Sequence, residues 1–315
     1  MKTAFIFPGQ GAQHVGMGRD LYEVSPAAKS LFDQAEAATG LPLTKLCSQG
    51  PEEELARTDI SQPAIFTVSA ALLKCMDERL SPPQQATIAP AYLAGLSLGE
   101  YTALYAAGAM DFATAVRLVA RRGQAMQAAA KAVPSGMVSV LGLDEAKAAE
   151  LARSAAEGQV LVCANFNAPG QVVLSGSLEA CQRAAAKAAD FGASGAVPLK
   201  VAGAFHSPLM QPAAEELAKA LDQATITELQ RPVVANVDAA CYRRAADIRG
   251  KLLAQLVSPV RWQQSMEFLL VAGVERFYEI GPGRVLAGLM KRINRRAEVT
   301  CINSVQALEK LTIPS

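Results

Sequence analysis

Apolar and polar positions follow two rhythms along the chain, and in its first part these rhythms alternate. Short apolar runs of strand length are separated by stretches in which apolar residues recur at helical spacing, as in residues 62–76. Strands that alternate with helices are typical of an α/β domain with a largely parallel sheet. The pattern predicts strands at 4–7 and 88–94, and helices at 25–38, 62–76, 100–107 and 112–131.

A different order of elements begins near Pro134. The pattern predicts, in turn, a strand at 136–143, a helix at 144–156, strands at 160–165 and 171–175, a helix at 178–191 and a strand at 195–199. This β-α-β-β-α-β order is that of the ferredoxin-like unit. We therefore expect a ferredoxin-like subdomain at residues 133–200, inserted into a larger α/β domain formed by residues 1–132 and 201–315. The larger domain resumes with predicted strands at 233–237 and 276–280 and a helix from Arg284.

Composition and charge exclude several classes of function. The 315 residues are 51% hydrophobic and carry a net charge of +1, which argues against general binding to nucleic acid or an anionic membrane. No apolar run approaches the roughly 20 residues of a membrane-spanning helix, and the apolar segment at 4–7 is too short for a signal peptide. The six cysteines form no Cys-x-x-Cys pair, which favours reduced thiols and, with only two histidines, argues against a zinc site. We expect a cytoplasmic protein without a bound metal.

The most specific chemical signal is Gly95-Leu96-Ser97-Leu98-Gly99, between the strand and the helix predicted on either side of it. Gly-x-Ser-x-Gly in this context is the pattern of a nucleophile elbow, a sharp turn that lifts a serine hydroxyl clear of the sheet. The glycines let strand and helix pass closely, and the helix N-terminus turns backbone N–H groups toward developing negative charge. Ser97 is therefore the candidate nucleophile. The alternative is a chance match in an ordinary loop, since the chain has 23 glycines.

A serine hydroxyl needs a positioned base, and the chain contains only His14 and His206. His14 follows a glycine-rich loop, which favours a surface position. His206 lies where the chain re-enters the larger domain, directly after the predicted subdomain. We predict that His206 is the base; the alternative is a histidine at a helix start that only backbone groups contact.

The loop at residues 7–13, Phe-Pro-Gly-Gln-Gly-Ala-Gln, follows the first predicted strand. Its glycines allow the backbone to approach a ligand closely, and an N–H group there can pair with that of Leu98 as two donors to an oxyanion. A phosphate-binding loop is the rival interpretation. However, neither Gly-x-x-x-x-Gly-Lys-Ser/Thr nor Gly-x-Gly-x-x-Gly occurs there, so nucleotide binding is not expected.

Seven motifs are spread along the chain. They are Phe7-Pro-Gly-Gln-Gly-Ala-Gln13, Gly95-Leu-Ser-Leu-Gly-Glu100, Arg122-Gly123, Asn165-Phe-Asn-Ala-Pro-Gly-Gln171, Ala204-Phe-His-Ser-Pro208, Gln255-Leu-Val-Ser-Pro-Val-Arg-Trp262 and Glu279-Ile-Gly-Pro-Gly283. In their residues and order, over essentially the whole chain, they make it resemble the malonyl-CoA:acyl carrier protein transacylases of type II fatty acid synthesis. The resemblance implies an α/β-hydrolase-like larger domain with a ferredoxin-like insertion.

The resemblance also implies catalytic roles for particular residues. It makes Ser97 the nucleophile and His206 the general base and later the acid. The backbone N–H groups of Gln10 and Leu98 then form the oxyanion hole. The main-chain carbonyl of Gln255 orients His206 through the other ring nitrogen.

Substrate contacts follow from the same resemblance. Arg122 is expected to hold the free carboxylate of a malonyl group, because guanidinium offers a planar fork of donors; without the resemblance, a solvated arginine is favoured. Phe205 is bulky where relatives that accept methylmalonyl have a smaller residue, which predicts malonyl over methylmalonyl. Asn165 and Asn167 are expected to shape the cleft between the domains. Leu96 departs from the family, many members of which have histidine there, so the fit beside the acyl pocket stays open.

The reaction implied is transfer of a malonyl group from malonyl-CoA to the phosphopantetheine thiol of an acyl carrier protein, through a malonyl-serine ester. Coenzyme A enters as a thioester substrate, no bound cofactor is expected, and we expect a monomer. Carrier proteins are usually acidic, so a basic docking surface is expected. The densest basic run contains Lys291, Arg292, Arg295 and Arg296. Cations that stabilise a helix C-terminus are the alternative explanation of this run.

Three rival functions remain. A serine esterase or thioesterase uses the same elbow, but normally orients its histidine with an Asp or Glu side chain and has no use for Arg122. An acyltransferase of a polyketide or malonate decarboxylase system would perform the same chemistry on another carrier. A catalytically inactive scaffold that binds carrier protein is the non-enzymatic alternative.

Overall fold

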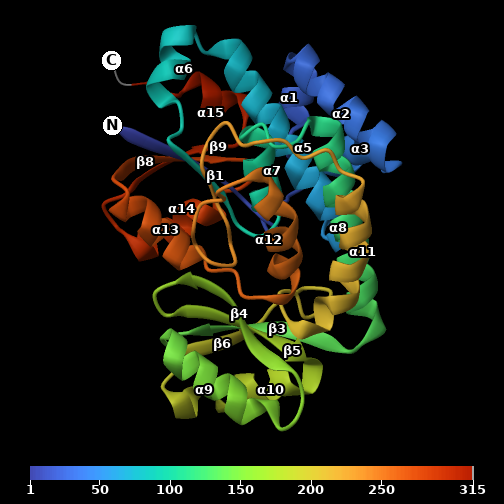
Figure 1. Cartoon of the computed structure of the whole chain (residues 1–315), viewed down its shortest axis with the longest axis vertical. Coiled ribbons are helices and arrows are strands. Elements are labelled where there is room, and N and C mark those ends of the chain that lie inside the picture. Colours follow the sequence, from blue (N-terminus) through green and yellow to red (C-terminus); the bar gives the residue numbers. More distant parts are fainter. Residues whose placement is uncertain (314–315) are drawn as a thin grey trace.

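The computed structural model describes residues 1–313, which form two β-sheets surrounded by helices (Figure 1). The larger sheet has five strands in the order β7-β2-β1-β8-β9, and all of its pairings are parallel. These strands are β1 (Lys2–Phe7), β2 (Tyr92–Gly95), β7 (Val233–Val234), β8 (Val274–Ile280) and β9 (Glu298–Ile302). The predicted α/β class with a mostly parallel sheet is confirmed.

Strand β1 lies at the centre of the larger sheet because it is apolar on both faces. Its residues from Thr3 to Phe7 are buried, and it pairs with β2 on one side and β8 on the other. A continuous apolar run is typical of a parallel strand that helices cover on both faces. Phe7 is the register partner of Gly95, and the N–H of Leu96 donates to the carbonyl oxygen of Phe7 at 3.0 Å. The loops that follow β1 and β2 therefore start side by side.

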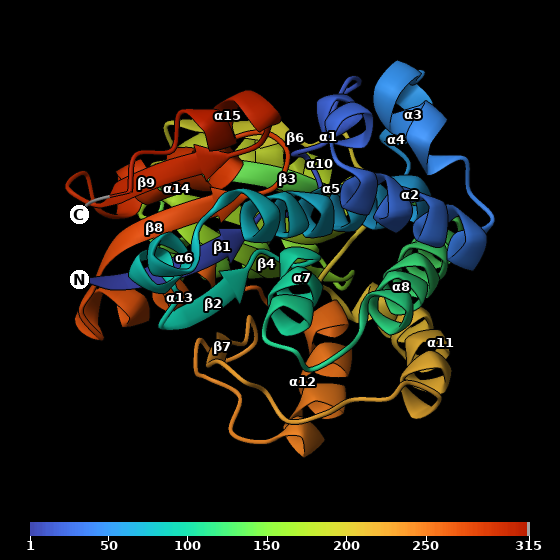
Figure 2. The same cartoon turned by 90° about the horizontal axis from the view of Figure 1, so that it is seen from above.

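Helices pack around the larger sheet, as the view from above shows (Figure 2). The long helices α5 (Thr58–Arg79) and α8 (Phe112–Ala132) pack against each other and contribute much of the main apolar core. The other helices around this sheet are α1 (Arg19–Val24), α2 (Pro26–Thr39), α3 (Leu43–Gln49), α4 (Glu52–Leu55), α6 (Pro82–Ile88), α7 (Gly99–Ala106), α11 (Gln211–Asp222), α12 (Ala245–Val257), α13 (Trp262–Val271), α14 (Val285–Ile293) and α15 (Val305–Glu309). Across residues 1–313, no helix has both the length and the apolar character that a membrane span requires.

The second sheet has four strands in the order β4-β5-β3-β6, and its pairings are antiparallel. In chain order its elements are β3 (Ser135–Leu141), α9 (Glu145–Ala156), β4 (Leu161–Ala168), β5 (Gln171–Ser177), α10 (Leu178–Lys187), a 3-10 turn (Ala188–Phe191) and β6 (Gly195–Pro198). The predicted β-α-β-β-α-β order is therefore present. These elements enclose an apolar cluster of their own, separate from the main core.

The two sheets meet at β4 and the segment between α12 and α13. Two backbone hydrogen bonds of 2.9 Å join β4 to Val260, and Asn165 forms a bridge with the same residue. The buried side-chain oxygen of Asn167, also on β4, has no hydrogen-bond partner among residues 1–313. The junction is important because His206 follows β6 and Gln255 lies near the end of α12.

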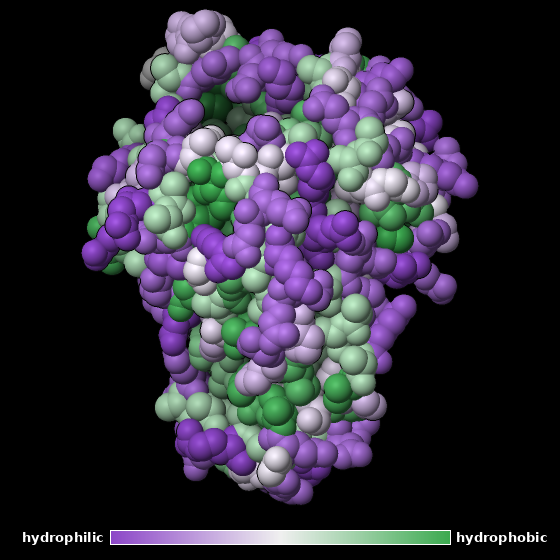
Figure 3. Space-filling view, turned by 45° about the vertical axis from the view of Figure 1, so that its right-hand side comes forward, coloured by the Kyte–Doolittle hydropathy of each residue, from purple (hydrophilic) through white to green (hydrophobic). Residues whose placement is uncertain are grey.

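The second sheet occupies the narrower end of the molecule. On the surface of this end, apolar side chains are mixed with polar ones (Figure 3).

Two predicted strands differ from those observed. The strand predicted at 88–94 begins only at Tyr92, because α6 extends through Ile88. Ser81 starts that helix with a capping box, in which Gln84 accepts a hydrogen bond from the backbone of Ser81, and proline occupies the first turn. Of the strand predicted at 233–237, only Val233 and Val234 are in a strand.

Candidate active site

Ser97 lies in a sharp turn between β2 and α7, as the elbow pattern predicts. Its backbone φ is 52°, in the left-handed region that costs a non-glycine residue about 1–2 kcal/mol. The neighbouring glycines are required by close packing. A Cβ on Gly95 would lie 1.9 Å from the carbonyl carbon of Gly99, and one on Gly99 would lie 2.1 Å from the carbonyl oxygen of Phe7. The N–H of Ser97 donates to Oδ1 of Asn236 at 2.7 Å, which stabilises the strained turn.

His206 faces Ser97. Oγ of Ser97 and Nε2 of His206 are 2.8 Å apart, and Nδ1 of His206 is 2.7 Å from the main-chain carbonyl oxygen of Gln255. Because a carbonyl oxygen only accepts, Nδ1 carries the proton and Nε2 keeps a lone pair for the serine hydroxyl. The structure thus brings together a hydroxyl, a base and a group that orients the base, which is the arrangement that nucleophilic catalysis needs.

The protonation state of His206 follows from its surroundings. The side chain is buried, with only 4% of the residue exposed. Burial and then the positive charge of Arg122 lower the pKa of His206 from 6.5 to about 4, while the hydrogen bond with Gln255 acts in the opposite direction. The imidazole is therefore neutral at pH 7, the state in which it accepts a proton.

Arg122, on α8, is buried against the candidate nucleophile, with 1% of the residue exposed. Its Nη2 donates to Oγ of Ser97 at 3.0 Å and to Oε1 of Gln255 at 2.8 Å. Its Nη1 donates to Oε1 of Gln62 at 2.6 Å, and the guanidinium lies over the ring of Tyr101. Within residues 1–313, Nε is buried without an acceptor, and the side chains that accept from Nη1 and Nη2 are all neutral. A buried cation with neutral partners is costly, so the site is suited to an anionic group of a ligand.

The N–H groups of Gln10 and Leu98 lie beside this turn. A Cβ on Gly9 would lie 2.4 Å from the carbonyl oxygen of Leu96, so only glycine allows the two loops to approach this closely. Within residues 1–313, neither of the two N–H groups donates a hydrogen bond. The side chain of Gln10 donates to Thr58 at 3.2 Å, which fixes the loop to α5. Two unused donors beside a serine are suited to an oxyanion.

The remaining residues singled out from the sequence lie in different surroundings. Phe205 is buried directly before His206, and its carbonyl oxygen accepts a hydrogen bond of 2.7 Å from Oγ of Ser175. His14 is exposed, in agreement with the preference for His206 as the base. Leu96 is half-buried and packs against the apolar cluster beneath the larger sheet.

Sequence reasoning missed several polar residues that support the site. Gln62 on α5 and Asn236 after β7 are buried and contact Arg122 and Ser97. Glu100 is 1% exposed, and burial raises its pKa to about 7 although its hydrogen bonds and the charge of Arg122 lower it. For Gln62 and Glu100 the available signal was a polar residue within an otherwise apolar helix, because a buried polar side chain must be hydrogen-bonded. Asn236 lies outside any helix and carried no such signal.

Metal chemistry has no obvious centre in the described chain. Among residues 1–313, no group of three or more His, Cys, Asp or Glu side chains is arranged to hold a metal ion. All six cysteines are free thiols. The site consists of a serine, a neutral imidazole, a buried guanidinium and unused backbone donors, a set that is suited to acyl transfer through a serine ester.

The sequence matches the family model of the acyl transferase domain over residues 4–308. It is 46% identical to the malonyl CoA-acyl carrier protein transacylase of Escherichia coli K12 over 308 residues, which cover 97% of each chain. It is 44% identical to the protein of the same name from Bacillus subtilis, over 98% of this chain and 95% of that one. The chain belongs to the malonyl CoA-acyl carrier protein transacylase family.

Solved structures of this family have the same fold. The transacylase of Coxiella burnetii superimposes with a TM-score of 0.93 at 40% identity, over 98% of this chain and 96% of that one. A malonyl-transacylase solved in complex with a type II polyketide acyl-carrier protein gives a TM-score of 0.91 at 41% identity, over 98% of both chains. The family resemblance expected from the seven motifs is thereby confirmed.

Proposed function

We propose that the protein transfers a malonyl group from malonyl-CoA to the phosphopantetheine thiol of an acyl carrier protein, through a malonyl ester on Ser97. The observation that carries this proposal is the buried guanidinium of Arg122, which lies 3.0 Å from Oγ of Ser97. Within residues 1–313 it donates to no carboxylate, although the charge of the buried Glu100 acts on it through space. A general serine hydrolase has no use for such a cation. An acyl group with its own carboxylate supplies an anion that the guanidinium can contact directly.

In the first half-reaction, Oγ of Ser97 attacks the thioester carbonyl while Nε2 of His206 takes the hydroxyl proton. The carbonyl oxygen becomes negatively charged and accepts hydrogen bonds from the N–H groups of Gln10 and Leu98. The C–S bond then breaks, the sulfur leaves with the proton from His206 as the thiol of coenzyme A, and the malonyl group stays on Ser97. Gln255 holds the imidazole throughout, through its main-chain carbonyl.

The second half-reaction repeats these steps with another thiol. The phosphopantetheine thiol gives its proton to Nε2 of His206 and attacks the ester carbonyl. The bond to Oγ of Ser97 breaks, and the proton returns to that oxygen. The carrier leaves with the malonyl thioester, and the free enzyme is restored. Transfer rather than hydrolysis requires that the thiol be better placed for attack than water.

The position of Arg122 also limits the length of the acyl group. In a malonyl ester a single methylene separates the ester carbonyl from the carboxylate, so the anion lies close to the nucleophile. Nη2 already contacts Oγ, which supports a short dicarboxylic acyl group over a longer one. Phe205, which directly precedes the base, is a bulky buried residue, and its size supports malonyl over methylmalonyl.

The carrier partner is supported by the relative that was solved with its acyl-carrier protein. Because that carrier belongs to a type II polyketide system, an acyltransferase of polyketide synthesis is the second candidate function for this chain. No comparable observation supports a role in a malonate decarboxylase system or a thioesterase activity. In either carrier system coenzyme A is part of the substrate, and the reaction as derived needs no cofactor.

Several broader expectations belong to this proposal. The strand order β4-β5-β3-β6 with helices α9 and α10 supports a ferredoxin-like subdomain at residues 133–200. The parallel sheet and the elbow support an α/β-hydrolase-like domain formed by the rest of the chain. Free thiols support a cytoplasmic location. A monomer stays an expectation from the sequence.

The test of this proposal is incubation of the purified protein with malonyl-CoA and an acyl carrier protein that bears phosphopantetheine. Malonyl-carrier and free coenzyme A are the expected products, in equal amounts. A thioesterase would instead release free malonate. Carriers from fatty acid and polyketide synthesis, compared by kcat/KM, distinguish the two candidate pathways.

A further inference from the structure

Glu100 is a buried carboxyl group that the mechanism above does not use. It lies in the first turn of α7, three residues after Ser97, yet its side chain does not cap that helix. Oε2 accepts hydrogen bonds from Nε2 of Gln255 at 2.6 Å and from the N–H of Asn236 at 3.2 Å, and Oε1 accepts from the hydroxyl of Tyr242. All three donors come from distant parts of the chain, so no need of the local helix explains this side chain.

Two of the donors to Glu100, Asn236 and Gln255, are themselves in contact with the reacting residues. The amide of Gln255 donates from Nε2 to the carbonyl oxygen of Ser97 at 2.9 Å and accepts, through Oε1, from Arg122 at 2.8 Å. The main-chain carbonyl oxygen of Gln255 also accepts a hydrogen bond from Nδ1 of His206. One residue, held by Glu100, therefore connects the nucleophile, the base and the cation.

Glu100 orients the Gln255 amide together with the carbonyl oxygen of Ser97, and it provides the shorter of the two hydrogen bonds, 2.6 Å against 2.9 Å. A side-chain amide has a donor end and an acceptor end, and a flip exchanges them. Oε2 of Glu100 is an acceptor and therefore attracts Nε2 of Gln255, which leaves Oε1 facing the donors of Arg122. A flipped amide would place donor against donor at Arg122 and acceptor against acceptor at Glu100.

We propose that Glu100 is a positioning residue: its Oε2 atom fixes the amide of Gln255, and through that amide it sets the direction of the Arg122 guanidinium that selects the malonyl carboxylate. The proposal deepens the malonyl-transfer function and rests on it. Arg122 matters for an acyl group with a carboxylate and not for acetyl, whereas Ser97 and His206 serve both. Loss of Glu100 positioning should therefore reduce selectivity more than it reduces acyl transfer in general.

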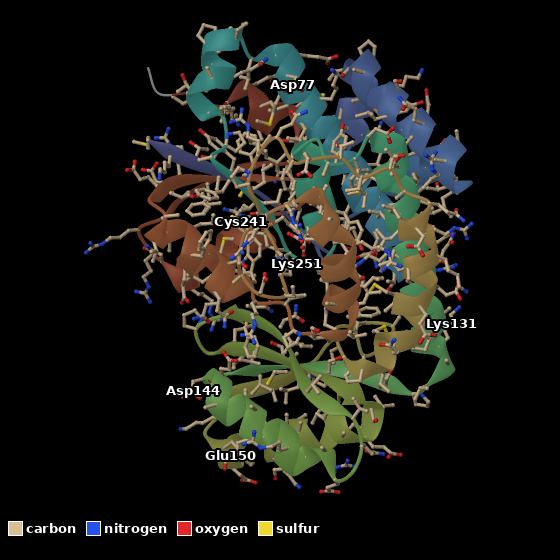
Figure 4. The ribbon with its side chains drawn as sticks, viewed as in Figure 1. Asp77, Lys131, Asp144, Glu150, Cys241 and Lys251 are labelled. Atoms are coloured by element: carbon tan, nitrogen blue, oxygen red, sulfur yellow. The ribbon has the colours of Figure 1, made fainter. Side chains whose placement is uncertain are left out.

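The surroundings of this cluster connect it to the surface. Lys251, on α12 one turn before Gln255, lies with Nζ 5.0 Å from the ring centroid of Tyr242 and 2.9 Å from Oδ2 of Asp238. Figure 4 shows Lys251 on that helix, in the part of the molecule that holds the larger sheet. Tyr242 therefore lies between a partly exposed ion pair and the buried carboxyl group of Glu100.

Two conservative variants separate positioning from charge. Glu100→Gln keeps the length of the side chain and an acceptor oxygen in the place of Oε2, but removes the charge. Glu100→Asp keeps the charge and withdraws the oxygen by one methylene. Positioning predicts that Gln stays within about threefold of wild type in the ratio of kcat/KM for malonyl-CoA to that for acetyl-CoA, whereas Asp lowers this ratio by about tenfold or more. A role as counter-charge to Arg122 predicts the opposite order.

A second measurement tests whether the effect passes through Gln255. In the Gln255→Ala background the main-chain carbonyl remains but the amide is absent. Glu100→Asp should then change the malonyl-to-acetyl ratio by less than about twofold, because its target has been removed. Glu279→Asp is the matched control, since Glu279 is also a buried carboxylate, which accepts from the N–H groups of Leu286 and Ala287, but lies outside the site. The control should leave the ratio unchanged.

The outcomes are distinguishable. If wild-type protein transfers no malonyl group, the proposed function fails and Glu100 is not at issue. If wild type transfers malonyl, two results overturn the positioning role. One is that Glu100→Asp lowers malonyl and acetyl transfer by the same factor. The other is that Glu100→Asp lowers the malonyl-to-acetyl ratio as much in the Gln255→Ala background as in wild type. The positioning role is also overturned if Glu100→Gln lowers the malonyl-to-acetyl ratio more than Glu100→Asp does.

Discussion

The guanidinium of Arg122 donates a hydrogen bond of 3.0 Å to the hydroxyl oxygen of Ser97. In the absence of substrate, the guanidinium therefore contacts the nucleophile directly. Its other acceptors are the amide oxygens of Gln62 and Gln255, both uncharged. A bound acyl group with a carboxylate gives this guanidinium the hydrogen-bonded ion pair that it otherwise lacks, which is the physical source of the selectivity that we propose.

Replacement of Arg122 should alter selectivity rather than all catalysis. Arg122→Gln is expected to lower kcat/KM for malonyl-CoA by about 100-fold, because the carboxylate then enters a buried site without its charged partner, while transfer from acetyl-CoA is largely kept. Arg122→Lys should restore little, since an ammonium lacks the planar fork. Steady-state rates with both thioesters check this. Equal losses for the two substrates would show that Arg122 supports the fold and not the acyl group.

The low pKa of His206 predicts an unusual acid limb. Activity requires the neutral imidazole, and burial beside Arg122 lowers the pKa from 6.5 to about 4. The value of kcat/KM for malonyl-CoA should therefore stay constant as the pH falls through 6.5, and it should decrease only at lower pH, with a midpoint near 4. In Arg122→Gln the midpoint should rise, because a positive charge beside the imidazole is lost. A wild-type midpoint near 6.5, measured while circular dichroism shows folded protein, would contradict the account.

The same shift affects stability, and its sign follows from proton binding. Between about pH 4 and 6.5 the unfolded chain protonates His206 while the folded chain does not. The contribution of His206 to the free energy of unfolding is therefore complete above pH 6.5 and decreases as the pH falls toward 4. Urea unfolding of wild type and His206→Gln, compared at pH 7 and pH 5, measures this contribution.

Gly9 should be indispensable for the oxyanion donors. In Gly9→Ala the new Cβ meets the carbonyl oxygen of Leu96 at 2.4 Å, so the loop that carries Gln10 must move away from the turn. We expect kcat to fall by about 100-fold or more, the usual effect of losing one oxyanion donor, in a protein that still folds. Gly288→Ala is the control, because nothing lies within 4 Å of the added Cβ. Retained kcat in Gly9→Ala would argue against a role of Gln10.

The basic run at the end of α14 gives a prediction about the carrier. Arg295 and Arg296 are exposed and, within residues 1–313, form no ion pair, whereas Arg292 donates to Gln171 at 3.0 Å. The double change Arg295→Glu and Arg296→Glu should raise the KM for an acidic carrier protein and leave that for malonyl-CoA unchanged. Kinetics with each substrate varied separately checks this. If neither KM changes, the run only stabilises the C-terminus of its helix.

The sequence predicted the parallel sheet and the β-α-β-β-α-β order because apolar periodicity records which faces are buried. It also pointed to Ser97 and His206, since a sharp turn and a scarce base leave few alternatives. It failed where the surroundings decide the role of a residue. Periodicity and charge favoured a solvated Arg122, whereas in the structure it is buried and donates to Gln62 of α5 and Gln255 of α12.

Glu100 illustrates the same limit. In the sequence it is an acidic residue in the first turn of a helix, a position that the helix dipole favours on any surface. Its contacts with Asn236, Tyr242 and Gln255 bring together segments more than a hundred residues apart. Local patterns carry no information about such pairings, so this network could be read only from the structure.

The central claim is that Ser97 carries the malonyl group between the two thiols. Intact-protein mass spectrometry after brief exposure to malonyl-CoA, without carrier, tests it most directly. The account predicts a mass increase of one malonyl group on the wild-type chain, which disappears when carrier protein is added and never forms on Ser97→Ala. An adduct that persists on Ser97→Ala, or a wild-type chain that turns over malonyl-CoA but shows no adduct on rapid quenching, would contradict it.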